Sequence, residues 1–250
     1  MSNLQLAKRL QERGDPLVSA NTIGRALRAM DIVRKMPAAK PLLTAAHKQR
    51  RLAWCLASQG RDWSHVVFTD EATLRFAPLR QKLLMKNGKQ RKVVSTTKHP
   101  PSLMMWGGIS SRGATPLAPI TGKINSVVYQ DVLLDYLVTT MSIHYPDVFV
   151  LQQDNAPPPV SRSIRAFFDA QWIEFMEWPA QSPDLNPIEN LWGILKKDFA
   201  PKKGTTVAEW KKNAVRLWDG MLVEKLQELI ESMPCRIEAF IIADGGHTRY

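Results

Sequence analysis

The stretch QSPDLNPIENLWGILKKDF, residues 181–199, combines a tight turn with the first turns of a helix. Asn186 is a residue type favoured at a helix N-cap, and Pro187 is favoured at the first helical position. Glu189 then occupies the third position, where an acidic side chain can reach back and complete a capping box. The stretch alone leaves two roles open for Glu189, helix capping or chemistry at the start of the helix.

The two faces of this helix differ in character. Apolar side chains recur every three or four positions and predict a buried face; they are Ile188, Leu191, Trp192, Leu195 and Phe199. Glu189 shares the other face with Gly193 and Lys196. Glycine allows a close backbone approach and lysine suits a phosphate, so this face could meet a polyanion.

The net charge points to such a partner. The 250 residues include 34 Lys and Arg against 23 Asp and Glu, a formal net charge of +11. Residues 1–62 hold 12 basic and 4 acidic residues, and residues 80–98 hold 7 basic and no acidic ones. Basic charge in two dense blocks favours nucleic acid as a partner over a merely solvated surface.

Cysteine usage and hydropathy limit the class of protein. Cys55 and Cys235, the two cysteines, lie far apart and lack metal-ligand spacing, which argues against a disulfide scaffold or a zinc site. The sequence shows neither an apolar run of bilayer-spanning length nor a signal-peptide pattern. We expect a soluble protein of a reducing compartment, nuclear in a eukaryotic host and intracellular otherwise.

The N-terminal region has a helical pattern. Helices are predicted over residues 4–13 and over about 20–30, the second capped by Ser19, with a turn that contains Gly14 between them. With Arg25 and Arg28 on the second helix, this pattern fits either a DNA-binding helix-turn-helix or an ordinary helical hairpin. Residues 37–41 read as a linker, and a basic helix is predicted over 44–58.

From residue 65 onward the pattern becomes that of an α/β domain. Strands are predicted over residues 65–76, 102–110, 115–122, 147–155 and 172–179. Helices are predicted over residues 124–141, 161–170 and the stretch from 187, followed by two or three more. Strands followed by alternating strands and helices predict a mixed sheet flanked by helices. We therefore expect three segments, residues 1–36, 37–62 and 63–250.

Three acids stand out in this domain. Alternation along HVVFTDEATLRF (residues 65–76) places Asp70 on the face of Phe68 and Leu74, and Glu71 on the more polar face. A carboxylate on an apolar face is costly unless it is paired or binds a metal, which singles out Asp70 over Glu71. Asp154 ends the strand VFVLQQD, where an Asx turn is the alternative to a functional role.

Asp70, Asp154 and Glu189 would repel one another if they met at one sheet edge. Divalent cations relieve that repulsion, and a pair of Mg²⁺ ions can activate an attacking oxygen and stabilise a leaving one at a phosphodiester. An acidic site in a basic protein therefore suits metal-dependent cleavage of nucleic acid.

Four strings carry a resemblance to a known family: VVFTDEATLRF, KHPPSLMMWGGIS, LQQDNAPPPVSR and EWPAQSPDLNPIENLWGILKK. Together, and in this order, they resemble the DDE transposases of the Tc/mariner superfamily. The 34 residues between Asp154 and Glu189 match one branch of it.

The resemblance implies an RNase H-like core with Asp70, Asp154 and Glu189 as catalytic acids and ligands of two Mg²⁺ or Mn²⁺ ions. It implies cleavage of double-stranded DNA at the inverted repeats of a transposon, transfer to a TA target, and action as a homodimer. Arg25, Arg28 and Lys196 are the expected DNA contacts.

Two departures from the family pattern leave an alternative open. Pro159 stands where relatives usually carry a histidine, and Met1 falls within what resembles the second of two helix-turn-helix units, as if the chain were truncated. The alternative to an active enzyme is a weak or inactive remnant that binds DNA. A host nuclease for RNA–DNA hybrids fits the four strings less well.

Overall fold

The computed structural model describes residues 2–32, 40, 42–76, 100–120, 122, 126–146, 148–154, 162–199 and 205–250. Most of the expected linker at 37–41, the basic block 80–98 and Pro159 lie outside the described residues. The chain forms two compact units, Met1–Pro41 and Leu42–Tyr250, each described by itself.

The first unit contains the two predicted helices, α1 (Asn3–Glu12) and α2 (Ala20–Ala29), packed against each other. A capping box starts α1: the Gln5 amide donates to Ser2 Oγ over 3.1 Å, and the Ser2 amide donates to Gln5 Oε1 over 2.7 Å. Ser19 caps α2, as predicted, by accepting from the Thr22 amide over 3.1 Å. Both helix predictions are confirmed.

The second unit is built on the predicted mixed sheet, whose strand order is β3-β2-β1-β5-β6. The central strand β1 runs antiparallel to β2 and parallel to β5, and β4 extends the sheet as a further partner of β2. The strands are β1 (Val66–Arg75), β2 (Ser102–Ser110), β3 (Gly113–Ala114), β4 (Ala118–Ile120), β5 (Val150–Gln152) and β6 (Glu174–Met176). This confirms the expected fold class.

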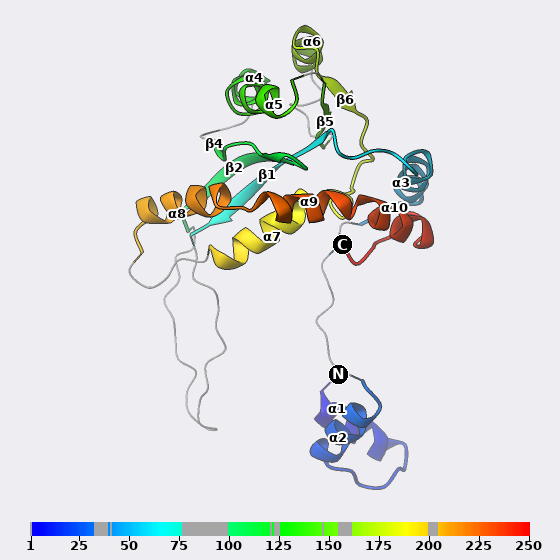
Figure 1. The fold of residues 1–250 in the computed structure, drawn as a ribbon. Helices are drawn as coiled ribbons and strands as arrows, with labels where there is room; N and C mark the ends of the chain where they lie inside the picture. Colours follow the sequence, from blue (N-terminus) through cyan, green and yellow to red (C-terminus); the bar gives the residue numbers. More distant parts are fainter. Residues whose placement is uncertain are drawn as a thin grey trace. The chain divides into compact units, whose positions relative to one another are not determined.

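Helices cover both faces of the sheet (Figure 1). One face packs against α4 (Ser126–Val132), the π-helical turn η1 (Leu133–Val138), α5 (Thr139–His144) and α6 (Arg162–Ala170). The other packs against α3 (Ala45–Ala57), α7 (Ile188–Asp198), α8 (Val207–Asp219), α9 (Val223–Glu231) and α10 (Met233–Ile242). No helix in the part of the chain that the structure describes is long and apolar enough to cross a membrane.

The predicted helix over 124–141 is a continuous run that widens in its middle. In η1 the Thr139 amide bonds to the carbonyl five residues earlier, at Leu134, and Thr139 Oγ1 donates to the same oxygen over 3.0 Å. An apolar periodicity near 3.6 does not distinguish such a π-helical turn from an ordinary helix.

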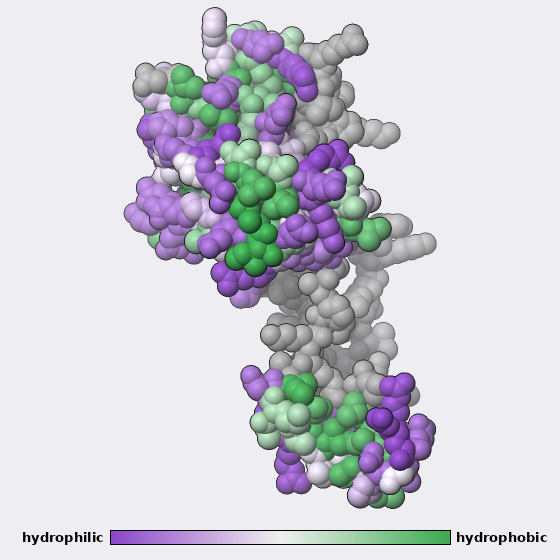
Figure 2. Space-filling view, turned by 90° about the vertical axis from the view of Figure 1, so that its right-hand side faces the viewer, coloured by the Kyte–Doolittle hydropathy of each residue, from purple (hydrophilic) through white to green (hydrophobic). Residues whose placement is uncertain are grey.

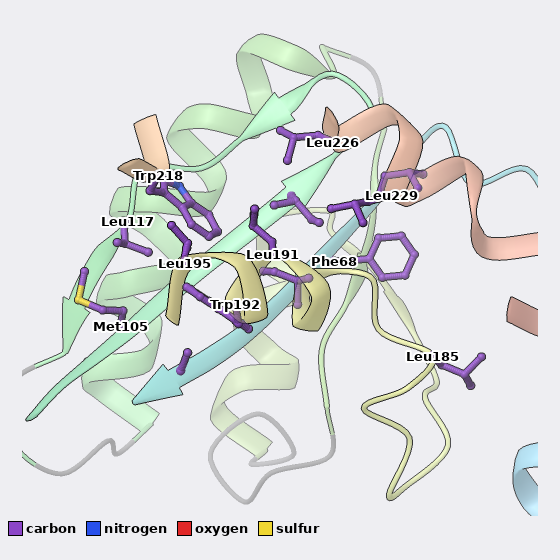
Figure 3. Packing of buried hydrophobic residues seen from close by; sticks show 14 of the residues in the cluster. Phe68, Met105, Leu117, Leu185, Leu191, Trp192, Leu195, Trp218, Leu226 and Leu229 are labelled. Carbon is purple, nitrogen blue, oxygen red and sulfur yellow. The ribbon is translucent and has the colours of Figure 1, made fainter. Parts of the chain in front are cut away.

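Side chains alternate along β1 as predicted. Phe68, Ala72 and Leu74 enter the core on the side of α7, whereas Val67 enters the core on the side of α4. Figure 3 shows the first of these cores, in which Trp192 belongs to the same cluster as Phe68. Asp70 therefore lies on the face that α7 covers.

Gly107 on β2, the cross-strand partner of Asp70, has no room for a side chain. A Cβ there would lie 2.7 Å from the Trp218 ring and 3.4 Å from the Trp192 ring. The two rings stack with centroids 5.0 Å apart, and Trp218 Nε1 donates to the Thr115 carbonyl over 2.6 Å, so neither ring is free to withdraw.

We expect Gly107→Ala to lower the free energy of unfolding by about 1–3 kcal/mol, because overpacking forces rings or strand to shift. Urea denaturation measures the change. Gly193→Ala in α7 is the control: no atom lies within 4 Å of its Cβ position, so alanine should stabilise the helix by up to about 1 kcal/mol. Equal effects of the two substitutions would contradict the argument.

Candidate active site

Asp70 is held in the middle of the central strand by a hydrogen bond from α7. Trp192 Nε1 donates to Asp70 Oδ2 over 3.1 Å. The same indole is fully buried in the core, where its N–H needs an acceptor. The tryptophan thus fixes one carboxylate oxygen of Asp70, Oδ2.

Asp154 follows the strand next to Asp70. In the parallel register of β1 and β5, Phe68 lies opposite Gln152. Asp70 is two residues beyond Phe68, and Asp154 is two residues beyond Gln152, so the chain brings both acids to the same level of the sheet. Asp154 is exposed, just past the last paired residue of β5.

Glu189 lies in the first turn of α7, whose start is tied to β1. Asn186 Nδ2 donates to the Thr69 carbonyl over 3.2 Å, one residue before Asp70. Asn186 Oδ1 accepts from the Ile188 amide over 3.3 Å, so Asn186 satisfies one free amide of the helix start.

Of the two roles left open for Glu189, the structure does not show helix capping. The N-cap position falls on Pro187, which makes no side-chain cap hydrogen bond, and the helix begins at Ile188. Glu189 then lies in the first turn, and its backbone amide donates to the Asn186 carbonyl over 3.2 Å. Because Asn186 turns its amide group toward β1, no capping box forms, and the Glu189 carboxylate is left for other partners.

The three acids lie within one another's electric field. Burial raises the pKa of Asp70 to about 8, and the negative charge of Glu189 is the next cause. Asp154 raises the pKa of Asp70 further and also raises that of Glu189. For Glu189 burial is the largest cause, and the positive charge of Lys196 opposes it. Asp70 and Glu189 are therefore costly to ionise here without a cation.

Glu71 is a functional candidate that the sequence pattern missed. It was expected on a polar face, but that expectation is wrong at this position because α4 covers the face. Burial raises the pKa of Glu71 to about 7, with the charge of Asp154 as a further cause. Its charge also raises the pKa of the buried Tyr129, after burial itself. The acidic region thus has a fourth member.

These donors suit a hard divalent cation, although they do not yet form a closed ligand cage. Among the residues with described positions, no three His, Cys, Asp or Glu side chains are gathered closely enough to hold an ion. The site is nevertheless made of carboxylates, which Mg²⁺ and Mn²⁺ favour, and their mutual repulsion is what such a cation relieves.

The other predicted residues occupy exposed positions. Lys196 is exposed on α7, near enough to Glu189 to lower the pKa of that carboxyl. Gly193, between them on the helix, opens onto free space. Arg25 and Arg28 are exposed on α2 of the first unit. The acids and Lys196 belong to one region, and the two arginines belong to the separately described first unit.

Trp192 was predicted as core, which is confirmed, but its hydrogen bond to Asp70 was not predicted. One signal was present: Trp192 lies three residues after Glu189, nearly one helical turn on, and a buried indole N–H seeks an acceptor. The sequence does not say which acceptor that is.

Comparison with known proteins gives a consistent result. Residues 65–208 match the family of DDE superfamily endonucleases, and residues 1–59 match a family described as transposase. The chain is 34% identical over 224 residues to the transposable element Tc3 transposase of Caenorhabditis elegans, covering 88% of this chain and 68% of that protein.

Solved structures show a similar fold. The mariner Mos1 paired end complex with Mg superposes with a TM-score of 0.82 at 21% identity, covering 100% of this chain and 76% of that one. The corresponding complex with Mn gives 0.81 at the same identity and coverage. At 21% identity, this similarity supports the assignment of the fold alone.

Proposed function

The chain belongs to the DDE superfamily of endonucleases, and on that basis we propose that it is a transposase that cuts double-stranded DNA at the ends of its own transposon. It then joins those ends to a TA target, acts as a homodimer, and works in the nucleus of a eukaryotic host. The observation that carries this proposal is that Asp70, Asp154 and Glu189 come close enough, just beyond the end of β5, for the charges of Glu189 and Asp154 to raise the pKa of Asp70.

Transposases of this class use a divalent metal, and the related Mos1 complexes contain Mg or Mn. We assign the ligands here as Asp70, Asp154 and Glu189, for two Mg²⁺ or Mn²⁺ ions. When bound, such ions activate the attacking oxygen and stabilise the leaving oxygen of the phosphodiester.

The residues of the chain prepare this site in distinct ways. Trp192 orients Asp70 by holding Oδ2. The raised pKa of Asp70, about 8, means that this carboxyl is mostly protonated at neutral pH and would lose its proton on binding a cation. Asn186 holds the start of α7 against β1, which keeps Glu189 beside Asp70.

We assign DNA contacts to both units. Lys196 is exposed near Glu189, where its ammonium would bind a phosphate beside the cut. Gly193 presents no side chain between them, so a DNA strand would pass close to the helix backbone. Arg25 and Arg28 on α2 would contact the transposon end.

The proposal predicts Mn²⁺-dependent nicking of supercoiled DNA, lost on chelation with EDTA. Asp154→Asn and Glu189→Gln remove a ligand charge each without changing side-chain size and should show no nicking above a buffer blank. Gel conversion of supercoiled to open-circular plasmid is the measurement.

The same assay separates the alternative. Equal nicking by parent and both variants would mean a contaminant, and no nicking on either a plasmid or the transposon's own ends would leave a DNA-binding remnant. Preferential cleavage of an RNA–DNA hybrid would instead support a host nuclease.

A further inference from the structure

We propose that four residues outside the acidic site, Arg51, Asp184, Asn190 and Arg236, form a hydrogen-bonded brace that positions Glu189 for metal binding. The inference rests on the proposed metal site. It concerns the geometry of the α7 start, which is set by segments that are far apart in sequence.

The first half of the brace is a guanidinium with every donor used. Arg51 is fully buried, and its Nη1 and Nη2 donate to the two carboxylate oxygens of Asp184, each over 3.0 Å. Nη1 also donates to the Gln181 carbonyl, and Nε and Nη2 donate to the carbonyls of Gly245 and Gly246, each over 2.9 Å. An arginine has five N–H donors, and all five are matched here, which offsets the desolvation of the charge.

The second half connects both sides of Glu189. Arg236 Nη1 donates to the Asp184 carbonyl over 3.1 Å, and Nη2 donates to Asn190 Oδ1 over 2.6 Å. A single guanidinium thus holds one residue before the helix and the residue directly after Glu189. Nε donates to Ser232 Oγ over 2.8 Å, which fixes the guanidinium itself. The brace therefore spans the residue whose carboxylate must point at the metal.

Core packing alone does not supply this constraint. Leu191, Trp192 and Leu195 bury α7 against the sheet, but apolar packing is non-directional and leaves small rotations of a helix end inexpensive. Asn190 is exposed overall, so its bond to Arg236 adds little to the core. What the bond does fix is the rotation of the first turn, and a metal ligand must be held within about 0.5 Å of its productive place.

The brace lies inside the second unit. It joins α3 to α10 and to the segment after α10, where Gly245 (φ +69°) approaches Lys48 so closely that a Cβ would meet the Lys48 carbonyl. Figure 2 views the side of the unit on which these two helices lie, where hydrophilic residues surround an apolar patch. Since Arg51 is 0% and Asp184 6% exposed, the ion pair is not a surface contact.

The test uses Asn190→Ala, with Asn213→Ala as a matched control on the exposed surface of α8. Mn²⁺ binding is measured directly by electron paramagnetic resonance of the free ion, and the thermal midpoint is measured in EDTA. We expect Asn190→Ala to weaken Mn²⁺ binding by about 10- to 100-fold, the usual loss when a partner that orients a metal ligand is removed. Its thermal midpoint should stay close to that of Asn213→Ala, which should bind Mn²⁺ like the parent.

A third variant, Glu189→Gln, distinguishes an error in the proposed brace from an error in the proposed metal site. If Glu189→Gln weakens Mn²⁺ binding and Asn190→Ala does not, the brace has no positioning role. If neither the parent nor any variant binds Mn²⁺, the proposed metal site itself is wrong. If Asn190→Ala lowers the thermal midpoint but leaves Mn²⁺ affinity unchanged, the bond is structural and the inference is overturned.

Discussion

Asp70→Asn is expected to lose at least about 1,000-fold in nicking rate and yet to unfold at a higher temperature than the parent at pH 8 without metal. The loss of rate follows from losing a ligand charge, because bound metal supplies several kcal/mol of transition-state stabilisation and 1.36 kcal/mol corresponds to a factor of ten. The gain in stability follows from the buried carboxylate itself.

The direction of the pH effect can be worked out from proton binding. The pKa of Asp70 is about 8 in the folded chain, against about 3.9 when unfolded. Between these values the folded state holds a proton that the unfolded state has lost, so the free energy of unfolding falls as pH rises from about 4 to about 8. Asparagine does not titrate, so Asp70→Asn removes this loss.

Urea denaturation in EDTA at pH 5 and pH 8 measures both effects. The free energy of unfolding of the parent should fall between pH 5 and pH 8, and that of Asp70→Asn should fall less. The fall that remains in the variant comes from Glu71, whose pKa is raised to about 7. Added Mn²⁺ at pH 8 should restore stability to the parent but not to the variant. Identical pH dependence in the two proteins would show that Asp70 ionises freely in the folded state.

Asp184→Ala is expected to lower the free energy of unfolding by about 3–5 kcal/mol, the usual cost of removing one partner from a buried ion pair. The charge of Arg51 would remain in the core with only neutral partners, the carbonyls of Gln181, Gly245 and Gly246 and the Ser182 hydroxyl. A loss of this size is a large part of the 5–15 kcal/mol that stabilises a typical domain, so Asp184→Ala should also express poorly.

The control is an exposed ion pair whose charged atoms are closer together than those of Arg51 and Asp184. Lys225 Nζ and Glu228 Oε2 are 2.6 Å apart, but the two side chains are 46% and 65% exposed. Lys225→Ala should cost less than about 1 kcal/mol, because water already solvates both charges. Comparable losses for Asp184→Ala and Lys225→Ala in urea denaturation would contradict the claim that burial, and not the distance between the charges, sets how much an ion pair contributes to stability.

The sequence predicted the parts of this fold that depend on local pattern. Alternation in residues 65–76 placed Phe68 and Val67 on opposite faces of the strand, and the structure confirms this, with a separate core on each face. The same alternation failed for Glu71, because the pattern of one strand does not show that a helix from residues 126–132 covers it. Polar neighbours along a strand are therefore weak evidence for an exposed face.

The contacts that orient the acids could not be predicted from sequence. Asp184 lies in a string that was read only as a turn, and its partner Arg51 precedes it by 133 residues. Trp192 and Asp70 are separated by 122 residues. Residue types could show that an indole N–H or a buried guanidinium needs acceptors, but only the folded chain decides which acceptors they are.

The brace also sets an order of events during protein synthesis. Arg51 bonds to the Gly245 carbonyl, 194 residues further along the chain. At about 5–20 residues per second, the ribosome needs roughly 10–40 s to reach that glycine. The helices of the first unit find their contacts within residues 2–32, so they can form during this interval. A nascent chain can therefore form the helices of its first unit before it can complete the proposed cleavage site.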